Sequence, residues 1–242
     1  MVLVAGLSSD NSIWNSIIDV LAKSFRITVF DNRGAGRSSQ SMGSYSIKQL
    51  AGDCIQLLEQ LNITSAYFAG HSLGGQIVQE IAISYPQYVA KAVIITSTYH
   101  YPEFAKMHFQ NVARLMEQGV NSELVFRTIF PWVFSSSFLR QTEMVDLSLQ
   151  AFQATVYPQS YAGYCGQIAA LREYNSFDEL SMINAPVLLI TGDDDLLIPT
   201  AHSEIMLEAI PNSYHARIAD CGHIPQIEAP GRLANLIHQF LR

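Results

Sequence analysis

The chain has 242 residues, of which 49% are hydrophobic and only 14% are charged. This composition supplies a large core and excludes intrinsic disorder, and the length fits a single α/β domain. The formal net charge of −7, without any cluster of Lys or Arg, argues against nucleic-acid binding. Cys54, Cys165 and Cys221 are far apart and form no CxxC pair or Cys/His ligand pattern. We therefore expect packed thiols in a reducing compartment and no metal site.

The N-terminus and the hydropathy pattern bear on localisation. Residues 1–6 lack a basic segment, and their apolar run is too short for a signal peptide. No stretch reaches the roughly 18 apolar residues of a membrane span. We expect a cytoplasmic protein without a membrane partner, either a monomer or a homodimer.

Short runs rich in β-branched residues alternate with longer helical patterns, which is typical of βαβ units and a mostly parallel sheet. One helical stripe contains Leu50, Cys54, Leu57, Leu58 and Leu61, and the last helix is expected to begin at Pro230. The fold class is therefore α/β, with a mostly parallel sheet of about six strands flanked by helices. The predicted strands lie at residues 2–5, 26–30, 66–69, 92–96, 187–191 and 214–219.

The alternation stops at residues 98–180, where amphipathic helices are predicted and no strand is. This segment holds 15 of the 25 aromatic residues of the chain. Because a small helical unit does not need so many aromatic residues for its own core, we expect some of them to line an apolar pocket. The predicted organisation is a core of residues 1–97 and 181–242 with a helical cap, or lid, of residues 98–180.

One pentapeptide has the form of a nucleophile elbow, G-x-S-x-G. Ser72 lies between Gly70 and Gly74, directly after the strand at 66–69 and before a helix. That context suits a serine on a tight strand-to-helix turn, where a Cβ at either glycine would collide with neighbouring backbone. The alternative for Ser72 is an ordinary helix N-cap.

A serine hydroxyl needs a positioned base, and the base needs an orienting acid. The strand at 187–191 is followed by Asp193, Asp194 and Asp195, and the last strand is followed by Gly222-His223. The chain order of serine, aspartate and histidine is the order of one scaffold that uses such a triad. At this point any of the three aspartates could be the acid.

Over essentially its whole length the chain resembles the α/β-hydrolase fold superfamily. The segment at 31–38 is similar to the D-x-R-G-x-G-x-S turn of that family, and Glu228-Ala229-Pro230 is similar to its E-x-P end. The resemblance implies Asp195 as the acid. It also implies an oxyanion hole made by the backbone N–H groups of Leu7 and Leu73. A finer resemblance is to 3-oxoadipate enol-lactonases and aminoacrylate hydrolases.

The chain departs from the family pattern in three places. Ala5 and Ala35 stand where the family commonly has histidine. Since the oxyanion donors are backbone groups, Ala5 is expected to change the support of the loop and not its function. The family also has a β-hairpin before the first strand seen here. Without that hairpin, the strand at 26–30 is expected to lie on an edge of the sheet.

The sequence thus predicts a serine hydrolase for a small to medium carboxylic ester or lactone, with no metal and no cofactor. Ser72 is the expected nucleophile, His223 the general base and Asp195 the orienting acid. The alternatives are enol-lactone, C–C bond or thioester hydrolysis by the same triad, or a ligand receptor with negligible turnover. An aromatic, slightly acidic cap favours a neutral substrate unless Arg114, Arg127, Arg140 or Arg172 turns inward.

Overall fold

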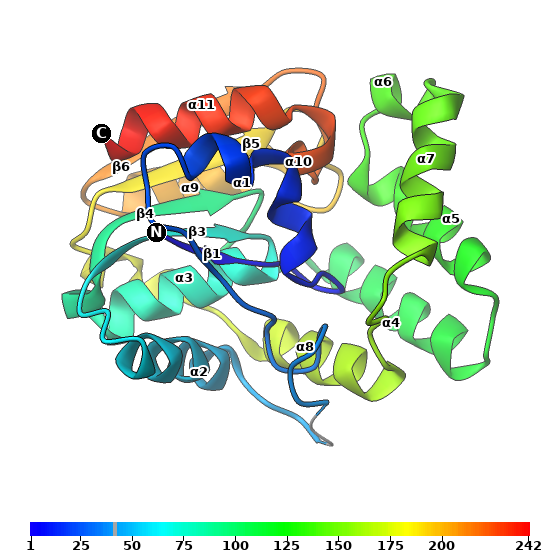
Figure 1. The fold of residues 1–242 in the computed structure, drawn as a ribbon, viewed down its shortest axis with the longest axis horizontal. Helices are drawn as coiled ribbons and strands as arrows, with labels where there is room; N and C mark the ends of the chain where they lie inside the picture. The colour runs from blue at the N-terminus through cyan, green and yellow to red at the C-terminus, as the bar shows by residue number, and fades with distance from the viewer. Residues whose placement is uncertain (41–42) are drawn as a thin grey trace.

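The computed structural model describes residues 1–40 and 43–242. A six-stranded sheet forms the centre of this part of the chain, with the strand order β2-β1-β3-β4-β5-β6 and every pair parallel (Figure 1). The predicted α/β architecture and all six predicted strands are confirmed. The strands are β1 (Val2–Val4), β2 (Thr28–Val29), β3 (Ala66–His71), β4 (Val89–Ile95), β5 (Val187–Gly192) and β6 (Ser213–Ile218).

The strand ends differ from the prediction by one or two residues in most strands, and the differences are largest in β2 and β4. β2 spans two residues of the predicted five and lies on the sheet edge as expected, pairing with β1 alone through Val2↔Thr28 and Leu3↔Val29. β4 begins three residues earlier than predicted, because Val89 and Lys91 join the ladder with β3. The apolar run that guided the prediction begins only at Ala92, so the polar start of β4 was missed.

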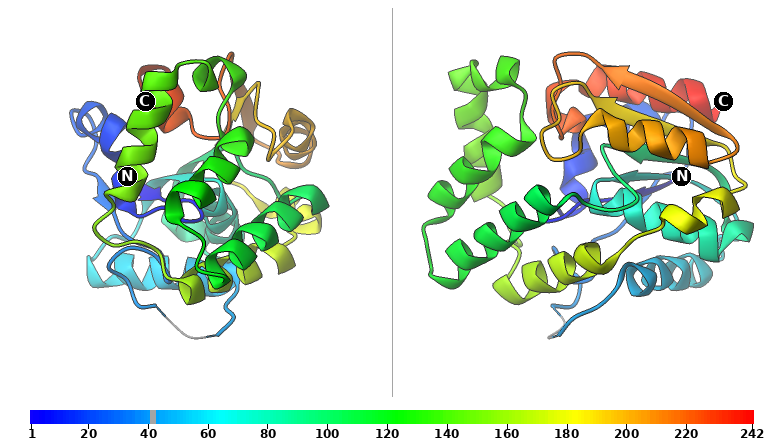
Figure 2. Two further views of the ribbon diagram at one scale, coloured as in Figure 1. Left: turned by 90° about the vertical axis from the view of Figure 1, so that its right-hand side faces the viewer. Right: turned by 180° about the vertical axis from the view of Figure 1, so that it is seen from behind.

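Helices cover both faces of the sheet (Figures 1 and 2). Successive strand side chains point to opposite faces, so Val2 and Val4 pack into one buried cluster and Leu3 into the other. α1 (Asn15–Leu21) and α11 (Pro230–Leu241) cover the Leu3 face. α2 (Ile47–Gln60), α3 (Leu73–Ser84) and α9 (Thr200–Ala209) pack against the opposite face.

Local sequence signals set the ends of these helices. α2 begins with a capping box, in which Oγ of Ser46 accepts from the backbone N–H of Gln49 and Oε1 of Gln49 accepts from the backbone N–H of Ser46. α11 begins at Pro230, as predicted. Leu50, Cys54 and Leu58 are buried as the predicted stripe requires, but Leu61 is 44% exposed because it lies at the C-cap, after the last helical residue. The stripe was therefore predicted one residue too long.

Residues 98–180 connect β4 to β5 and contain no strand in the structure. They form the helices that stand beyond the carboxyl ends of the strands (Figures 1 and 2). These are α4 (Glu103–Glu117), α5 (Ser122–Val133), α6 (Ser136–Leu139), α7 (Thr142–Gln153) and α8 (Tyr161–Glu173), followed by the 3-10 helix η3 (Phe177–Met182). The backbone N–H of Ser176 donates to the carbonyl of Tyr99 over 3.1 Å, so the two ends of the segment meet.

The remaining elements are short. They are the 3-10 helices η1 (Asn11–Trp14) and η2 (Pro86–Tyr88) and the helix α10 (Pro225–Glu228). Within the described residues, every helix is too short or too polar to cross a bilayer.

Candidate active site

Ser72 lies on a strained turn between β3 and α3. Its backbone has φ 55° and ψ −118°, a conformation that residues other than glycine rarely adopt. A Cβ on Gly70 would lie 2.2 Å from the carbonyl oxygen of Gly74, and one on Gly74 would lie 2.2 Å from that of Val4. The predicted reason for both glycines is thereby confirmed. The Ser72 side chain makes no capping hydrogen bond to the helix, which argues against the N-cap alternative.

Three predicted side chains form a hydrogen-bonded chain. Nε2 of His223 lies 2.9 Å from Oγ of Ser72, and Nδ1 of His223 lies 2.8 Å from Oδ2 of Asp195. All three residues are at most 7% exposed. They follow β3, β5 and β6, whose carboxyl ends lie at the same end of the parallel sheet. The structure therefore brings together the residues that the sequence named.

The structure separates Asp195 from its two neighbours. Asp195 Oδ1 accepts hydrogen bonds from the backbone N–H groups of Leu197 and Ile198, at 2.9 and 3.0 Å, which leaves Oδ2 for the histidine. Asp193 and Asp194 are exposed. The Asp193 carboxylate pairs with Arg217 at 2.7 Å. Only Asp195 of the three contacts His223.

The predicted oxyanion donors are the backbone N–H groups of Leu7 and Leu73. Leu7 lies in the turn after β1, and Leu73 is the first residue of α3, next to Ser72. In the part of the chain that the structure describes, neither backbone N–H donates a hydrogen bond to another group. Leu7 lines the same cavity as Ser72, and Leu73 follows Ser72 directly in the chain.

Side chains from two other segments support the turn that carries Leu7. Nδ2 of Asn32 donates to the carbonyl of Ala5 over 2.9 Å. Oγ of Ser8 donates to Oε1 of Gln159 over 2.9 Å, and Gln159 Nε2 donates to the carbonyl of Gly34 over 2.9 Å. Gln159 belongs to the segment between β4 and β5. The loop after Ala5 is therefore held by residues that the sequence pattern did not single out.

Three further side chains in the site were missed from the sequence. Nε2 of His71 donates to the carbonyl oxygen of His223 over 2.8 Å, and Oγ1 of Thr96 donates to the same oxygen over 2.9 Å. Burial, aided by the nearby His223, lowers the pKa of His71 to about 3, so the ring is neutral. The hydroxyl of Tyr101 lies 2.9 Å from Oγ of Ser72. The sequence placed Tyr101 only among the aromatic residues of the predicted cap.

A cavity of about 90 Å³ lies over Ser72 and His223. Its walls are mainly apolar and come from α4 and α5, which contribute Phe109, Val112, Phe126, Ile129 and Phe130. Burial lowers the pKa of His108, which also lines it, to about 4.

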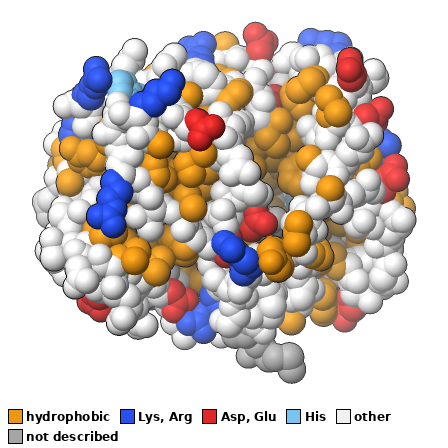
Figure 3. Space-filling view, in the orientation of Figure 1, with side chains coloured by type: hydrophobic (Ala, Val, Ile, Leu, Met, Phe, Trp, Pro, Cys, Tyr) orange, Lys and Arg blue, Asp and Glu red, His pale blue; other side chains and the backbone are white. Residues whose placement is uncertain are grey.

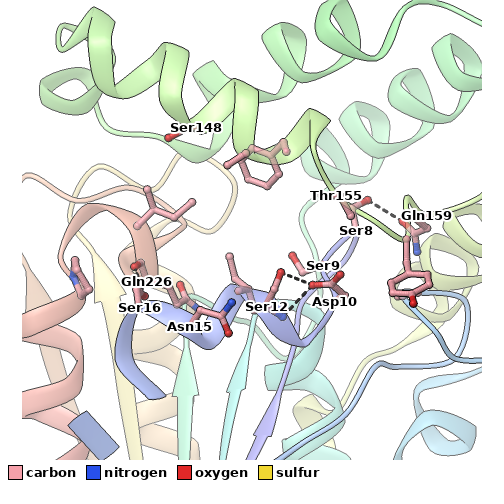
Figure 4. A pocket seen from close by; sticks show the side chains of 18 residues that line it. Ser8, Ser9, Asp10, Ser12, Asn15, Ser16, Ser148, Thr155, Gln159 and Gln226 are labelled. Atoms are coloured by element: carbon pink, nitrogen blue, oxygen red, sulfur yellow. Dashed lines mark hydrogen bonds between the residues drawn. The ribbon is translucent and has the colours of Figure 1, made fainter. Parts of the chain in front are cut away.

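A second cavity of about 420 Å³ adjoins the first and shares Ser8, Ser9 and Phe152 with it. It lies between the segment at 8–16, below, and α7, which carries Ser148, above (Figure 4). On the surface, hydrophobic side chains border a hollow beside α7 (Figure 3). Among the described residues, none of the side chains that line the two cavities is Lys or Arg.

Other residues near the site have structural roles. Glu228 accepts hydrogen bonds from the backbone N–H groups of Gly222 and Ser135, at 2.9 and 3.1 Å, and so fixes the loop of His223.

Burial raises the pKa of the Cys221 thiol, which argues against a thiolate nucleophile at this position. Asp31 accepts hydrogen bonds from the backbone N–H groups of Asn11 and Arg37 and braces its loop. In the described ranges, no three His, Cys, Asp or Glu side chains are grouped so as to hold a metal ion.

Comparisons with known proteins agree with this architecture. The sequence profile of the alpha/beta hydrolase fold family matches residues 1–230. A relative in Serratia proteamaculans (strain 568), named "Putative carbamate hydrolase RutD", is 31% identical over 226 residues, which cover 92% of this chain and 83% of the relative.

Solved structures superpose over nearly the whole chain. A thermophilic esterase from Thermogutta terrifontis has a TM-score of 0.88 at 26% identity, covering 100% of this chain and 88% of the esterase. The enol-lactonase from Burkholderia xenovorans LB400 has a TM-score of 0.88 at 24% identity, covering 99% of this chain and 90% of the lactonase, and it supports the fold alone. With a profile match over nearly its full length, the chain belongs to the alpha/beta hydrolase fold family.

Proposed function

We propose that the protein is a serine hydrolase that cleaves a small to medium carboxylic ester or lactone through an acyl-enzyme. The observation that supports this most directly is the unbroken hydrogen-bonded chain from Oγ of Ser72 through His223 to Asp195. A buried aspartate on Nδ1 keeps the proton on that nitrogen, which leaves Nε2 free to accept the serine proton.

In the proposed first half-reaction, Oγ of Ser72 attacks the substrate carbonyl carbon while Nε2 of His223 takes the hydroxyl proton. Asp195 stabilises the imidazolium that forms. The carbonyl oxygen becomes an oxyanion, to which the N–H groups of Leu7 and Leu73 donate; one such donor is typically worth about 3 to 4 kcal/mol. The C–O bond to the leaving alcohol then breaks, and that alcohol takes the proton from His223. In the second half-reaction, water attacks the acyl carbon in the place of the alcohol, and the acyl-enzyme is hydrolysed.

The cavity walls support a neutral substrate. The side chains over Ser72 are mainly apolar, and the described lining offers no cation to pair with a carboxylate. Of the four arginines considered from the sequence, Arg127 pairs with Glu123 at 2.9 Å on the surface of α5. An unpaired carboxylate in such a cavity loses its hydration without compensation.

A carbamate is a second candidate substrate. The Serratia relative is named for carbamate hydrolysis, and the same serine could attack a carbamate carbonyl in the same way. Enol-lactone, thioester and C–C bond substrates, and a receptor with negligible turnover, are the remaining alternatives.

A substrate panel tests the proposal. It contains p-nitrophenyl esters of graded acyl length, lactones, a phenyl carbamate and a thioester. We expect multiple turnovers on short or medium neutral esters or on lactones. Ser72→Ala should lower kcat by about 10⁶-fold with an unchanged Tm, while Ser84→Ala, at an exposed position of α3, should keep full activity. Full activity of Ser72→Ala would refute the nucleophile, and a single slow turnover would favour the receptor.

A further inference from the structure

The hydroxyl of Tyr101 contacts the same oxygen atom as the proposed general base. Its distance to Oγ of Ser72 is 2.9 Å, and the distance from that Oγ to Nε2 of His223 is also 2.9 Å. Tyr101 is fully buried and lies in the loop between β4 and α4. Its ring packs edge-on against Phe109 with a centroid distance of 5.5 Å. The position of the hydroxyl is therefore fixed.

The direction of this hydrogen bond follows from the rest of the chain. The Asp195 carboxylate accepts from Nδ1 of His223, so in the neutral ring Nε2 carries no proton and accepts the proton of the Ser72 hydroxyl. Burial raises the pKa of Tyr101, so the phenol keeps its proton at neutral pH. Tyr101 therefore donates to Oγ, and Oγ retains a second lone pair for attack on a carbonyl carbon.

We propose that Tyr101 is a catalytic residue that stabilises Ser72 as the leaving group when the acyl-enzyme breaks down. This inference rests on the proposed acyl-enzyme mechanism. During breakdown, water adds to the acyl carbon and gives one proton to Nε2 of His223. The bond between the acyl carbon and Oγ then breaks, its electron pair goes to Oγ, and Oγ takes the proton back from Nε2. Tyr101 keeps its own proton throughout.

The hydrogen bond assists the two half-reactions unequally. Before acylation, Oγ is a hydroxyl oxygen and already accepts fully from Tyr101, so the bond gains little strength on the way to the transition state. In the acyl-enzyme, Oγ is an ester oxygen, a poor acceptor, and it gains negative charge as the C–O bond breaks. Only interactions that strengthen on the way to the transition state accelerate a step. Tyr101 should therefore accelerate deacylation and leave acylation nearly unchanged.

Tyr101→Phe tests this by removing one oxygen atom. With a p-nitrophenyl ester, we expect kcat to fall about tenfold or more, since a hydrogen bond to a charged group contributes that much, and kcat/KM to stay within about threefold. A burst of one equivalent of p-nitrophenol should precede the slow phase. The acyl-enzyme should accumulate in acid-quenched samples, seen as a mass increase on Ser72. The phenyl ester of the same acid should give the same kcat, because both share one acyl-enzyme.

Tyr45→Phe is the matched control, because Tyr45 is buried and its hydroxyl donates to the carbonyl of Arg33 over 3.0 Å, on another segment. This variant should lose some stability without any burst. An equal fall of kcat and kcat/KM in Tyr101→Phe would show that Tyr101 only orients Ser72, and this result would overturn the proposal. An unchanged kcat would overturn it as well. A fluorophosphonate separates the two hypotheses: if it fails to label Ser72 in the wild type, the acyl-enzyme mechanism itself is wrong.

Discussion

Nε2 of His71 lies 2.8 Å from the main-chain carbonyl oxygen of His223, so the residue next to the proposed nucleophile holds the loop that carries the proposed base. A carbonyl can only accept, and the proton of His71 must therefore be on Nε2. Nδ1 of His71 is buried and has no hydrogen-bond partner among the described residues. A second proton on this ring would be desolvated, which explains why the pKa is lowered to about 3.

The first prediction concerns the dependence of stability on pH. The unfolded chain protonates His71 below about pH 6.5, whereas the folded chain does so only near pH 3. The unfolded state therefore binds the extra proton across this window. The contribution of His71 to folding stability is fully present above pH 6.5 and is lost progressively as the pH drops toward 3. Between pH 7.5 and pH 5, this one group should account for about 2 kcal/mol of lost stability.

His71→Gln keeps a donor for the His223 carbonyl and removes the titration. Urea unfolding of both proteins at pH 7.5 and pH 5 should show a smaller loss of stability in the variant. His108, whose pKa is also lowered, contributes equally to both proteins and cancels from the comparison. Equal losses in the two proteins would contradict the assignment of a buried neutral His71.

The second prediction separates the three neighbouring aspartates. In Asp195→Asn, the amide oxygen can still accept from Leu197 and Ile198, which turns the amide NH₂ toward Nδ1 of His223. That nitrogen must then accept, so the proton moves to Nε2 and the base is blocked. We expect kcat to fall by about 10⁴-fold, with Asp193→Asn and Asp194→Asn each within about threefold of wild type on the same ester. Equal sensitivity at Asp194 would place the acid one residue earlier.

The third prediction concerns the support of the oxyanion loop. Gln159→Ala removes the acceptor of the Ser8 hydroxyl and the link to the Gly34 carbonyl. With a looser turn at Leu7, we expect kcat/KM and the affinity for a boronic acid analogue of the tetrahedral intermediate to fall together, each by about tenfold. Gln141→Ala, at an exposed position of the same segment, should change neither. A lower kcat/KM with unchanged analogue affinity would exclude this role for Gln159.

The fourth prediction concerns substrate charge. The cavity lining described above lacks Lys and Arg, so kcat/KM for a neutral short-chain ester should exceed that for the matching half-ester of a dicarboxylic acid by at least about tenfold. Both substrates must be measured at one pH and one ionic strength. A preference for the half-ester would overturn the neutral pocket and favour an enol-lactonase-like activity.

Local patterns predicted the existence of the six strands and pointed to Ser72 and His223, whereas the choice of Asp195 among three neighbouring aspartates needed the family resemblance. β5 is an apolar run bounded by a proline and a glycine, and Ser72, Asp195 and His223 each follow a strand at a recognisable spacing. Tyr101, His71 and Gln159 follow no such rule. Their roles depend on contacts that span 29 residues to Ser72, 152 to His223 and 151 to Ser8. Such contacts depend on how segments far apart in the chain pack together, and no periodicity within a single segment reports that packing.

The hydrogen bond between Ser176 and Tyr99 has a consequence for how this protein could change over time. The chain leaves the sheet after β4 and returns to it before β5, with Tyr99 and Ser176 in contact. The entropic cost of closing the loop between these two residues grows only slowly with its length. Helices between these two residues could be lengthened, shortened or exchanged while β4 and β5 keep their register. Such exchanges would replace the walls of the cavity, while Ser72, Asp195 and His223 stay on the loops that follow β3, β5 and β6. New specificities could therefore arise here by insertion and deletion as readily as by point substitution.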